Sequence, residues 1–343
     1  MNTNIVEIAK RAGVSIATVS RALNNNGAVR EVTRQRILSI SKELNYIPNP
    51  HARGLSRKTT DTIGVILPEL IDEFFMDIIH GIDEEAYRAN KFVLISSSHS
   101  QRNIIETLLE FMGSGRVDGV ILMVPQLHTE AAELIQQSKR PVILLNVCSD
   151  LKDVISFNID DYQGAFAITE HLIKHNYQKI ATISGPSENC DAEERLRGYQ
   201  EAVIQLGLSL DKNLIISGDF TARSGYDGFK RLINQTPKPD AIFAANDMMA
   251  VGIFESARES GIKIPDDIAV VGFDDIYMSR FLQPRLTTVH VPIQELGSKA
   301  IQYLFKMLSG EVDSKLPYRE VLSTSLVIGG SCGCPYQSGH NIF

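Results

Sequence analysis

The sequence of 343 residues lacks the features that mark membrane, secreted and disulfide-stapled proteins. No apolar run reaches the roughly 18 residues that a membrane helix needs, and the chain opens on polar residues rather than on a signal peptide. The four cysteines, Cys148, Cys190, Cys332 and Cys334, are too few and too scattered for a disulfide framework. We therefore expect a cytoplasmic protein.

Metal, nucleotide and catalytic signatures are also scarce. Cys332, Cys334 and the nearby His340 could be the remnant of a metal site, but a fourth ligand is not apparent. Gly113-Ser-Gly115 lacks the third glycine of a dinucleotide-binding loop, and the chain has no P-loop, no Gly-x-Ser-x-Gly elbow and no His-Glu-x-x-His motif. The sequence thus predicts no cofactor and no metal, and it contains no catalytic constellation that would indicate an enzyme.

Charge is distributed unevenly along the chain. The formal net charge is −7, but residues 1–60 hold ten basic and three acidic side chains, which leaves −14 on the remainder. A basic head on an acidic body is expected when only one end of a protein meets phosphates. A solvated basic face without a nucleic-acid partner is the alternative that charge alone leaves open.

The run from Ala12 to Leu23 predicts a helix-turn-helix inside this basic head. Gly13 can turn at positive φ without steric cost, and Ser15 then offers an N-cap oxygen to a second helix. Val19 and Leu23 fall on one face of that helix. The opposite face, where a DNA-reading helix carries its base contacts, holds Ile16, Ala17, Thr18 and Arg21.

Two further helices would complete a small three-helix core. Residues 5–12 carry an apolar stripe, and residues 33–44 repeat it with Ile37, Leu38, Ile40, Ser41 and Leu44. Pro48 and Pro50 then break the helix, because each disfavours the α conformation in the residue before it. The basic stretch 51–58 is too short for a stable isolated helix, so we expect a partner to order it.

From residue 62 onward, apolar runs alternate with amphipathic helical patterns. The expected strands are 63–67, 92–96, 119–124, 141–145, 180–184, 214–217, 241–245 and 268–273. The expected helices are 74–89, 104–114, 129–138, 162–175, 193–206, 224–233 and 248–260. This alternation predicts parallel sheets covered on both faces, arranged as one large sheet, a barrel or two doubly wound lobes. A helix at 293–308 and an apolar run at 322–328 are left over.

Several motifs, in their order and spacing, resemble the LacI/GalR family of bacterial transcription regulators over almost the whole chain. They are Ile8-Ala-Lys-Arg-Ala-Gly-Val-Ser15 and Thr18-Val-Ser-Arg21 in the head, Tyr46-Ile-Pro-Asn49 and Ala52-Arg-Gly-Leu55 in the linker, and Ile63-Gly-Val65, Gly119-Val-Ile121, Gly185-Pro186, Arg195-Leu-Arg-Gly-Tyr199, Asn246-Asp-Met-Met-Ala-Val-Gly252, Val271-Gly-Phe-Asp-Asp275 and Pro284-Arg-Leu-Thr-Thr288 in the body. The resemblance implies an α/β chain with a small all-α helix-turn-helix head, a hinge, and a two-lobed body like the periplasmic sugar-binding proteins, with parallel doubly wound sheets.

The same resemblance implies domain boundaries. The head would take residues 1–48, the hinge 49–60, the effector-binding and dimerisation body 61–335, and a tail 336–343. Within the body, the N-terminal lobe would take about 62–161 and 291–322, and the C-terminal lobe about 162–290 and 323–335. The chain would then cross between the lobes three times, which accounts for the leftover elements. The tail has no apolar heptads, so we expect a homodimer on a palindromic operator rather than a coiled-coil tetramer.

For DNA, the resemblance places Ile16, Ala17 and Arg21 over base edges, where the Arg21 fork can bond guanine. The alternative for Ile16 is a place in the head core. The candidate phosphate contacts, which position the protein without specifying sequence, are Ser15, Thr18, Asn24, Thr33 and Tyr46. In the hinge, Leu55, with Ser56 beside it, matches the family's wedge, which opens a central base step from the minor groove.

For the effector, the resemblance carries over the polar residues Asn146, Arg195, Asn246 and Asp274, the walls Phe157 and Phe220, and Asp72 with Phe74 after the first strand. Such a set suits a sugar, whose hydroxyls bond polar groups while its C–H face meets an aromatic ring. Asn146 stands where several members have Asp, and residues 70–73 lack the common Asn-Pro, so a nucleoside or nucleobase stays open. The alternative for Arg195 and Asp274 is a structural ion pair.

These features together predict a sequence-specific DNA-binding repressor whose operator affinity is controlled by a small molecule between the lobes. The residues do not determine whether that ligand releases DNA or strengthens binding. The competing functions are a solute receptor without a transcriptional role and an enzyme that uses the cleft. The basic head and the missing signal peptide argue against a secreted receptor.

Overall fold

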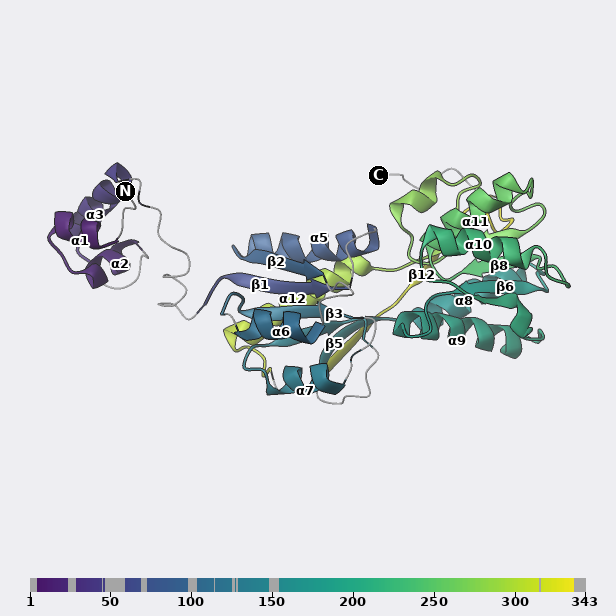
Figure 1. Ribbon diagram of the computed structural model, residues 1–343, viewed down its shortest axis with the longest axis horizontal. Helices are drawn as coiled ribbons and strands as arrows, with labels where there is room; N and C mark the ends of the chain where they lie inside the picture. Colours follow the sequence, from purple (N-terminus) through teal and green to yellow (C-terminus); the bar gives the residue numbers. More distant parts are fainter. Residues whose placement is uncertain are drawn as a thin grey trace.

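The computed structural model describes residues 5–23, 29–44, 46, 59–68, 73–97, 104–113, 115–124, 127, 129–147, 154–314 and 316–335. These residues form a three-helix head and a body of two α/β lobes (Figure 1). Among them, no helix combines the length and the apolar character that crossing a bilayer requires.

The head consists of α1 (Ile5–Ala12), α2 (Ile16–Leu23) and α3 (Glu31–Glu43). Ile8, Val19 and Ile37, one from each helix, are fully buried where the three helices meet. Leu38 was expected in this core, but its side chain is 41% exposed. A helix turns by about 100° per residue, so the immediate neighbour of the buried Ile37 cannot share its face.

The N-terminal lobe is built on a parallel six-stranded sheet in the order β11-β5-β4-β3-β1-β2. Its strands are β1 (Thr62–Leu67), β2 (Phe92–Ser97), β3 (Gly119–Met123), β4 (Val142–Leu145), β5 (Ile155–Ile159) and β11 (Tyr318–Leu322). Its helices are α5 (Glu73–Arg88), α6 (Ile104–Gly113), α7 (Thr129–Gln137) and α12 (Ile293–Ser309). Central strands such as β3 are buried at every residue, which explains their continuous apolar sequence.

The C-terminal lobe repeats this plan on a smaller scale. Its parallel four-stranded sheet runs β7-β6-β8-β9, with β6 (Ile180–Ser184), β7 (Ile215–Ser217), β8 (Ala241–Ala244) and β9 (Ala269–Val271). Its helices are α8 (Asp161–Lys174), α9 (Cys190–Gln205), α10 (Ala222–Leu232) and α11 (Asp247–Glu259), with 3-10 turns η1 (Lys212–Leu214) and η2 (Tyr277–Phe281). An antiparallel pair, β10 (Thr288–His290) and β12 (Ser325–Val327), completes the body.

The chain passes between the lobes after β5, after β10 and after β11 (Figure 1). These three crossings return α12 and β11 to the first lobe and β12 to the second. Of the arrangements that the sequence left open, the body therefore has the two doubly wound lobes, and the expected fold class is confirmed.

Three strands were missing from the expected elements. β5 alternates apolar and polar residues, and β11 carries Arg319 and Glu320, so neither has the continuous apolar run of the other strands. β10 is only three residues long. The buried Asn158 of β5 nevertheless finds a partner, since its Nδ2 donates to Val147 O at 3.2 Å. Polar residues in β5 and β11, and the short length of β10, thus conceal these strands in the sequence.

The chain enters the N-terminal lobe at a hydrogen-bonded junction. The Asp118 carboxylate accepts bonds from the backbone N–H groups of Thr60 and Asp61 at 2.6 and 2.9 Å, and from the Thr60 hydroxyl at 2.9 Å. Lys91 Nζ lies 3.1 Å from the carboxylate of Asp61. The last residue of the expected hinge and the residue after it are therefore fastened to the residue that precedes β3.

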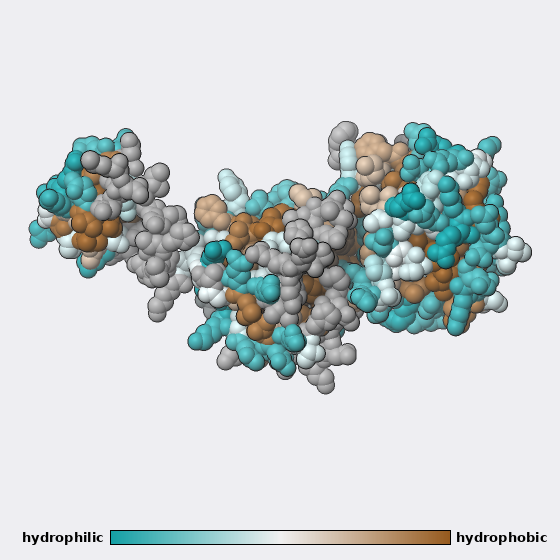
Figure 2. Space-filling view, viewed as in Figure 1, coloured by the Kyte–Doolittle hydropathy of each residue, from teal (hydrophilic) through white to brown (hydrophobic). Residues whose placement is uncertain are grey.

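The edge strand β2 does not fit the expectation that the sheet is covered on both faces. Phe92 is 71% exposed, and Leu94 and Ile95 are exposed as well. The space-filling view shows apolar surface on the N-terminal lobe between polar side chains (Figure 2). Proteins usually protect a sheet edge, so an exposed apolar edge is a candidate contact for another chain.

Candidate DNA-reading surface and interlobe cleft

The turn that precedes α2 has the geometry expected of a helix-turn-helix. Gly13 adopts a φ of 62°, the left-handed conformation that glycine reaches without steric cost. The Ser15 Oγ accepts a hydrogen bond from the Thr18 N–H at 3.2 Å and also lies 2.9 Å from Thr18 Oγ1. A side-chain cap of this kind contributes about 1 kcal/mol to a helix.

The residues expected to read bases lie on the outer face of α2. Ile16 is 46% exposed, Ala17 and Arg21 are exposed, and Thr18 is half-buried. This exposure disagrees with the alternative that Ile16 belongs to the head core. The face therefore presents one guanidinium between small apolar groups, which is suited to a guanine edge and to a thymine methyl group.

The other candidate DNA contacts are less accessible or lie outside the described residues. Thr33 is half-buried in the first turn of α3. Tyr46 packs against the head core, and its N–H donates to Ser41 O at 2.9 Å. Asn24, Leu55 and Ser56, together with the effector candidate Asp72, lie outside the described residues, so the hinge wedge stays a prediction.

A polar hollow of about 280 Å³ lies between the lobes, where β4 and β5 end and α8 and α9 begin. Asn146 follows β4 with a φ of 46°, a conformation that asparagine tolerates. Its Oδ1 accepts from the Ile159 N–H at 2.8 Å, and its Nδ2 donates to Asp191 Oδ2 at 3.1 Å. An aspartate here could not donate to Asp191, so the departure from the family pattern at Asn146 is matched by a carboxylate on the other lobe.

The guanidinium of Arg195 is the centre of a polar network on the C-terminal side of this cleft. Nε donates to Asp161 Oδ1 at 2.7 Å, and Nη1 donates to Ala245 O at 2.7 Å. Nη1 also lies 3.0 Å from Asp274 Oδ1, and the guanidinium covers the Phe273 ring at 3.9 Å from its centroid. The ion pair considered as a structural alternative is thus present, and Asp161 joins it.

Three carboxylates surround this one guanidinium. Burial raises the pKa of Asp191 well above its ordinary value, and the negative charge of Asp161 raises it further. Burial also raises the pKa of Asp161, in spite of the attraction of Arg195. Both carboxylates lie in the first turn of a helix, whose dipole favours the ionised form. The cleft therefore offers three carboxyl groups that can hydrogen-bond a ligand, and the raised pKa values of Asp191 and Asp161 limit how much negative charge they carry.

Phe220 and Asn246 meet beside the Arg195 network. The Asn246 side chain caps α11 by accepting from the Met249 N–H at 2.9 Å, and its Nδ2 donates to Phe220 O at 3.0 Å. Phe220 has a φ of 67°, and its ring centroid lies 5.7 Å from the Arg195 guanidinium carbon. The amide predicted to touch a ligand thus holds an aromatic residue next to the arginine.

A second hollow between the lobes, of about 650 Å³, is lined by the start of α5, the turn after β9 and the crossing before α12. Phe74 and Asp274 both line it. Phe157 does not join them, because it is 1% exposed and packs inside the N-terminal lobe against Tyr303 and Tyr318. Its side chain completes the hydrophobic core where a wall of the cleft was expected.

Sequence reasoning missed three aspartates at the cleft, which are Asp161, Asp191 and Asp247. Asp247 is fully buried and accepts from the Thr288 hydroxyl at 2.6 Å and from the Ile276 N–H at 3.1 Å. Burial raises the pKa of Asp247 well above its ordinary value. The signal that could have found all three is their place in the first turn of a helix after a parallel strand, the edge where α/β folds bind ligands.

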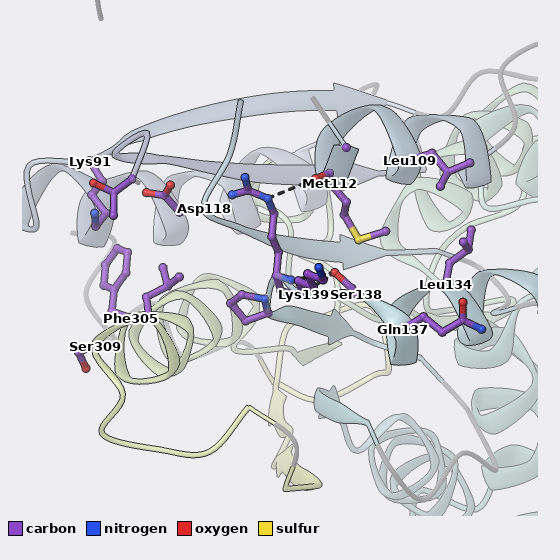
Figure 3. Close-up of a pocket in the computed structure, with 15 residues that line it drawn as sticks. Lys91, Leu109, Met112, Asp118, Leu134, Gln137, Ser138, Lys139, Phe305 and Ser309 are labelled. Carbon is purple, nitrogen blue, oxygen red and sulfur yellow. Dashed lines mark hydrogen bonds between the residues drawn. The ribbon is translucent and has the colours of Figure 1, made fainter. Parts of the chain in front are cut away.

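A wider hollow of about 1190 Å³ lies at the opposite end of the N-terminal lobe, near the junction with the hinge (Figure 3). Thr59, Asp118 and Lys139 line it, and Arg140 Nε donates to Met112 O at 3.2 Å beside it. None of the expected effector residues that the structure describes lies there. The interlobe cleft is therefore the candidate effector site.

Comparison with known proteins agrees with this architecture. A family model described as bacterial regulatory proteins, lacI family, matches residues 4–49, and a periplasmic binding protein-like domain model matches residues 169–332. Catabolite control protein A of Priestia megaterium is 34% identical over 93% of this chain and 98% of its own length. Both the head and the body thus have counterparts in one relative of similar length.

Two solved structures are similar over nearly the whole chain. The lac repressor dimer bound to operator and the anti-inducer ONPF has a TM-score of 0.85 at 29% identity, and the match covers 97% of this chain and 99% of that chain. The complex of the transcriptional regulator CelR with cellobiose has a TM-score of 0.73 at 29% identity, covering 96% and 99%. The chain therefore belongs to the lacI family of bacterial regulatory proteins, and it is a DNA-binding transcription regulator.

Proposed function

We propose that this regulator is a repressor that binds a palindromic operator as a homodimer, and that a neutral, hydroxyl-rich sugar between the lobes controls its operator affinity. The observation that carries the ligand assignment is the cluster of Asp161, Asp191 and Asp274 around the single guanidinium of Arg195. The similar structures support it, since one holds operator with an anti-inducer and the other holds cellobiose.

The charge of the cleft favours a neutral ligand over an anion. Arg195 is already paired with Asp161 and Asp274, so it has little capacity to neutralise a phosphate. Carboxylate oxygens accept hydrogen bonds from hydroxyl groups, whereas an anionic ligand would be repelled at short range. The ring of Phe220 beside Arg195 can cover the apolar face of a pyranose.

A nucleoside or nucleobase is the second candidate ligand. Phe74, in the second hollow, stands edge to face with Phe75 and remains only partly buried. Phe220 is partly buried as well. Either ring could stack on a base, and acidic side chains nearby could accept from exocyclic amino groups.

The homodimer rests on exposed apolar side chains of both lobes. The Tyr277 N–H donates to Glu73 Oε1 at 2.7 Å, so η2 of the C-terminal lobe lies against the start of α5. α5 in turn packs on β2. Exposed apolar side chains along these elements are Met76, Phe92, Leu94, Ile95, Tyr277 and Phe281. A second copy of the chain, related by a two-fold axis, would cover such a surface.

Coupling between the cleft and DNA would work through the populations of two lobe arrangements. A ligand that binds one arrangement better changes the spacing of the two N-terminal lobes in the dimer. Asp118 accepts hydrogen bonds from the backbone of residues 60 and 61. A movement of the N-terminal lobe would therefore also move the end of the proposed hinge at residues 49–60. The ligand thereby changes whether two hinges fit one minor groove.

Operator affinity measured with and without ligand tests this function. Full-length protein is first screened by thermal shift against neutral sugars, sugar phosphates and nucleosides, because a bound ligand raises apparent stability. We expect a neutral sugar to raise the melting temperature and to change operator affinity, about 5–150-fold for typical coupling. Response to nucleosides alone favours the second candidate, and a stabilising ligand that leaves operator affinity unchanged contradicts the proposed control.

The DNA-reading surface makes a separate prediction about specificity. Arg21→Ala should reduce the preference for operator over random DNA by about 1–3 kcal/mol, since Arg21 is the one side chain on that face with a bidentate donor fork. Thr33→Ala should weaken binding to all sequences alike, because a phosphate contact carries no sequence information. Fluorescence anisotropy with both DNAs at fixed salt measures the two effects. Identical behaviour of the two variants would mean that α2 is not the reading helix.

A further inference from the structure

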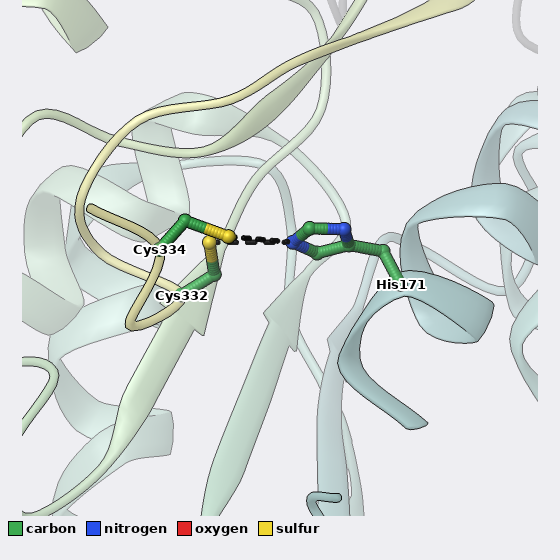
Figure 4. A group of neighbouring side chains, drawn as sticks. All are labelled: His171, Cys332 and Cys334. Atoms are coloured by element: carbon green, nitrogen blue, oxygen red, sulfur yellow. Dashed lines mark hydrogen bonds between the residues drawn. The ribbon is translucent and has the colours of Figure 1, made fainter. Parts of the chain in front are cut away.

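Four nitrogen and sulfur donors from distant parts of the sequence converge in the C-terminal lobe. His171 and His175 lie one turn apart on α8 and its C-terminal end, and Cys332 and Cys334 lie in the segment after β12. Figure 4 shows His171 pointing at both sulfurs. Its Nε2 lies 3.3 Å from Cys332 Sγ and 3.8 Å from Cys334 Sγ, and His175 Nε2 lies 3.0 Å from Cys334 Sγ.

These separations suit a tetrahedral ion. Zinc–sulfur bonds of about 2.3 Å and zinc–nitrogen bonds of about 2.0–2.1 Å place tetrahedral ligand atoms roughly 3.5 Å apart. The three nitrogen–sulfur distances lie on both sides of that value. The donor atoms of His171, Cys332 and Cys334 all lie within 4.8 Å of one another. His171, Cys332 and Cys334 therefore already form a three-ligand group, and a small adjustment of the exposed His175 side chain would add the fourth ligand.

The surroundings hold these donors in place. Gly333 has a φ of 88°, a conformation that L side chains rarely adopt, and it turns the chain so that both cysteines face α8. The Thr287 hydroxyl donates to Cys332 Sγ at 3.0 Å, and Tyr177 Oη donates to Cys332 O at 3.1 Å. His175 Nδ1 lies 2.8 Å from His171 O, where its N–H donates and leaves the Nε2 lone pair toward Cys334. Metal sites use this kind of outer contact to orient their ligands.

A disulfide is the main competing fate for the two cysteines. Cys190 is disulfide-bonded, a feature that the cysteine spacing did not predict, whereas Cys332 and Cys334 are free thiols. Two thiols and two imidazoles together form the donor set that zinc prefers in structural sites. The sequence did not reveal these two histidines as ligands, because α8 and its C-cap lie more than 150 residues before the cysteines. His340, the histidine that the sequence suggested, lies outside the described residues.

We propose that His171, His175, Cys332 and Cys334 bind one divalent zinc ion, which fastens the segment after β12 to the C-terminal end of α8. Binding exchanges the two thiol protons, which pass to solvent, for two sulfur–metal bonds. Cys332 follows β12, the strand that the chain reaches after its third crossing between the lobes. The ion would therefore hold the segment after this crossing on the C-terminal lobe. Its role is structural, and it lies outside the effector cleft.

Cobalt(II) titration of the reduced, metal-free full-length protein tests the site. We expect one equivalent to bind, with thiolate-to-cobalt charge-transfer absorption and the visible bands of tetrahedral cobalt, and we expect zinc to displace it. Cys334→Ser and His175→Gln each remove one of the more accessible ligands. Losing a residue that only orients a metal ligand costs up to about 100-fold in metal affinity, so losing a ligand itself should weaken zinc binding by at least about 100-fold. His80→Gln, an exposed histidine on α5, is the matched control and should bind like the wild type.

A second measurement on the wild type avoids any variant that fails to fold. Added zinc should slow alkylation of Cys332 and Cys334, followed by peptide mass spectrometry, and a chelator should reverse the protection. The proposal is overturned by cobalt binding without thiolate charge transfer, by equal affinity in Cys334→Ser and wild type, or by a Cys332–Cys334 disulfide that persists after reduction.

Discussion

An Arg195→Met variant is expected to lose about 3–5 kcal/mol of stability in the C-terminal lobe. Arg195 is 3% exposed and is held by Asp161, the Ala245 carbonyl and Asp274. Methionine has a similar length, but it would leave two carboxylates buried without a counter-charge. Removing one partner of a buried pair costs more than the pair itself contributes, because the remaining charge keeps its full desolvation penalty.

Arg197→Met is the matched control for this prediction. Arg197 lies two residues further along α9, and its guanidinium pairs with Glu194 and Glu201 at the surface. Its side chain is 49% exposed. Exposed ion pairs typically contribute about 0–1 kcal/mol, so the same substitution at Arg197 should change stability little. The contrast between the two variants isolates the effect of burial from that of removing a charge.

Hydrogen exchange is the suitable measurement, because a body of two lobes need not unfold in one step. Amides of β6 and β8 should exchange about 10²–10⁴-fold faster in Arg195→Met, while those of β1 and β3 keep their protection. Adding Asp161→Asn should restore part of the protection by removing one uncompensated charge. Equal exchange in the Arg195 and Arg197 variants would show that the buried network contributes no stability.

Periodicity predicted those elements whose burial is uniform. α1 spans Ile5–Ala12 as expected, and β6 spans Ile180–Ser184, because in each case apolar side chains follow the geometry of a single buried face or of a strand buried on both faces. Periodicity did not predict β5 and β11. In β5, Ser156 and Asn158 are buried polar residues, and β11 carries two charged residues. Local pattern cannot report a polar residue whose partner lies elsewhere in the chain.

The candidate cleft residues were also predicted only in part, because their partners lie elsewhere in the chain. The structure places Asn146 and Arg195 in one network, and their partners Asp161 and Asp191 come from the starts of two helices. The family resemblance identified Arg195 as a candidate, but it did not identify Asp161 and Asp191, whose carboxyl groups lie near the Arg195 guanidinium. Phe157 shows the converse, because its aromatic character fits a ligand wall and a hydrophobic core equally well, and only packing distinguishes them.

Phe92→Glu is expected to convert the dimer to monomer and to weaken binding to a full palindromic operator by on the order of 10²–10⁴-fold. Phe92 begins the edge strand β2, and its side chain is 71% exposed, so a charge there costs little in the fold of one copy. In a two-fold interface the same position occurs twice, and burying two carboxylates against apolar side chains opposes association. In the dimer, binding of one head raises the effective concentration of the second head at its half-site. A monomer has one head only and lacks this gain in affinity.

Ile204→Glu is the control, since Ile204 is a 58% exposed apolar residue on α9, away from β2 and η2. Sedimentation velocity gives the oligomeric state, and anisotropy with full and half operators gives the affinity. Phe92→Glu should bind both DNAs equally weakly, whereas Ile204→Glu should keep the wild-type preference for the full palindrome. A Phe92→Glu protein that stays dimeric would place the interface elsewhere. A monomer that keeps full affinity would mean that one head suffices, and a two-headed mechanism built on the spacing of the lobes would then have no basis.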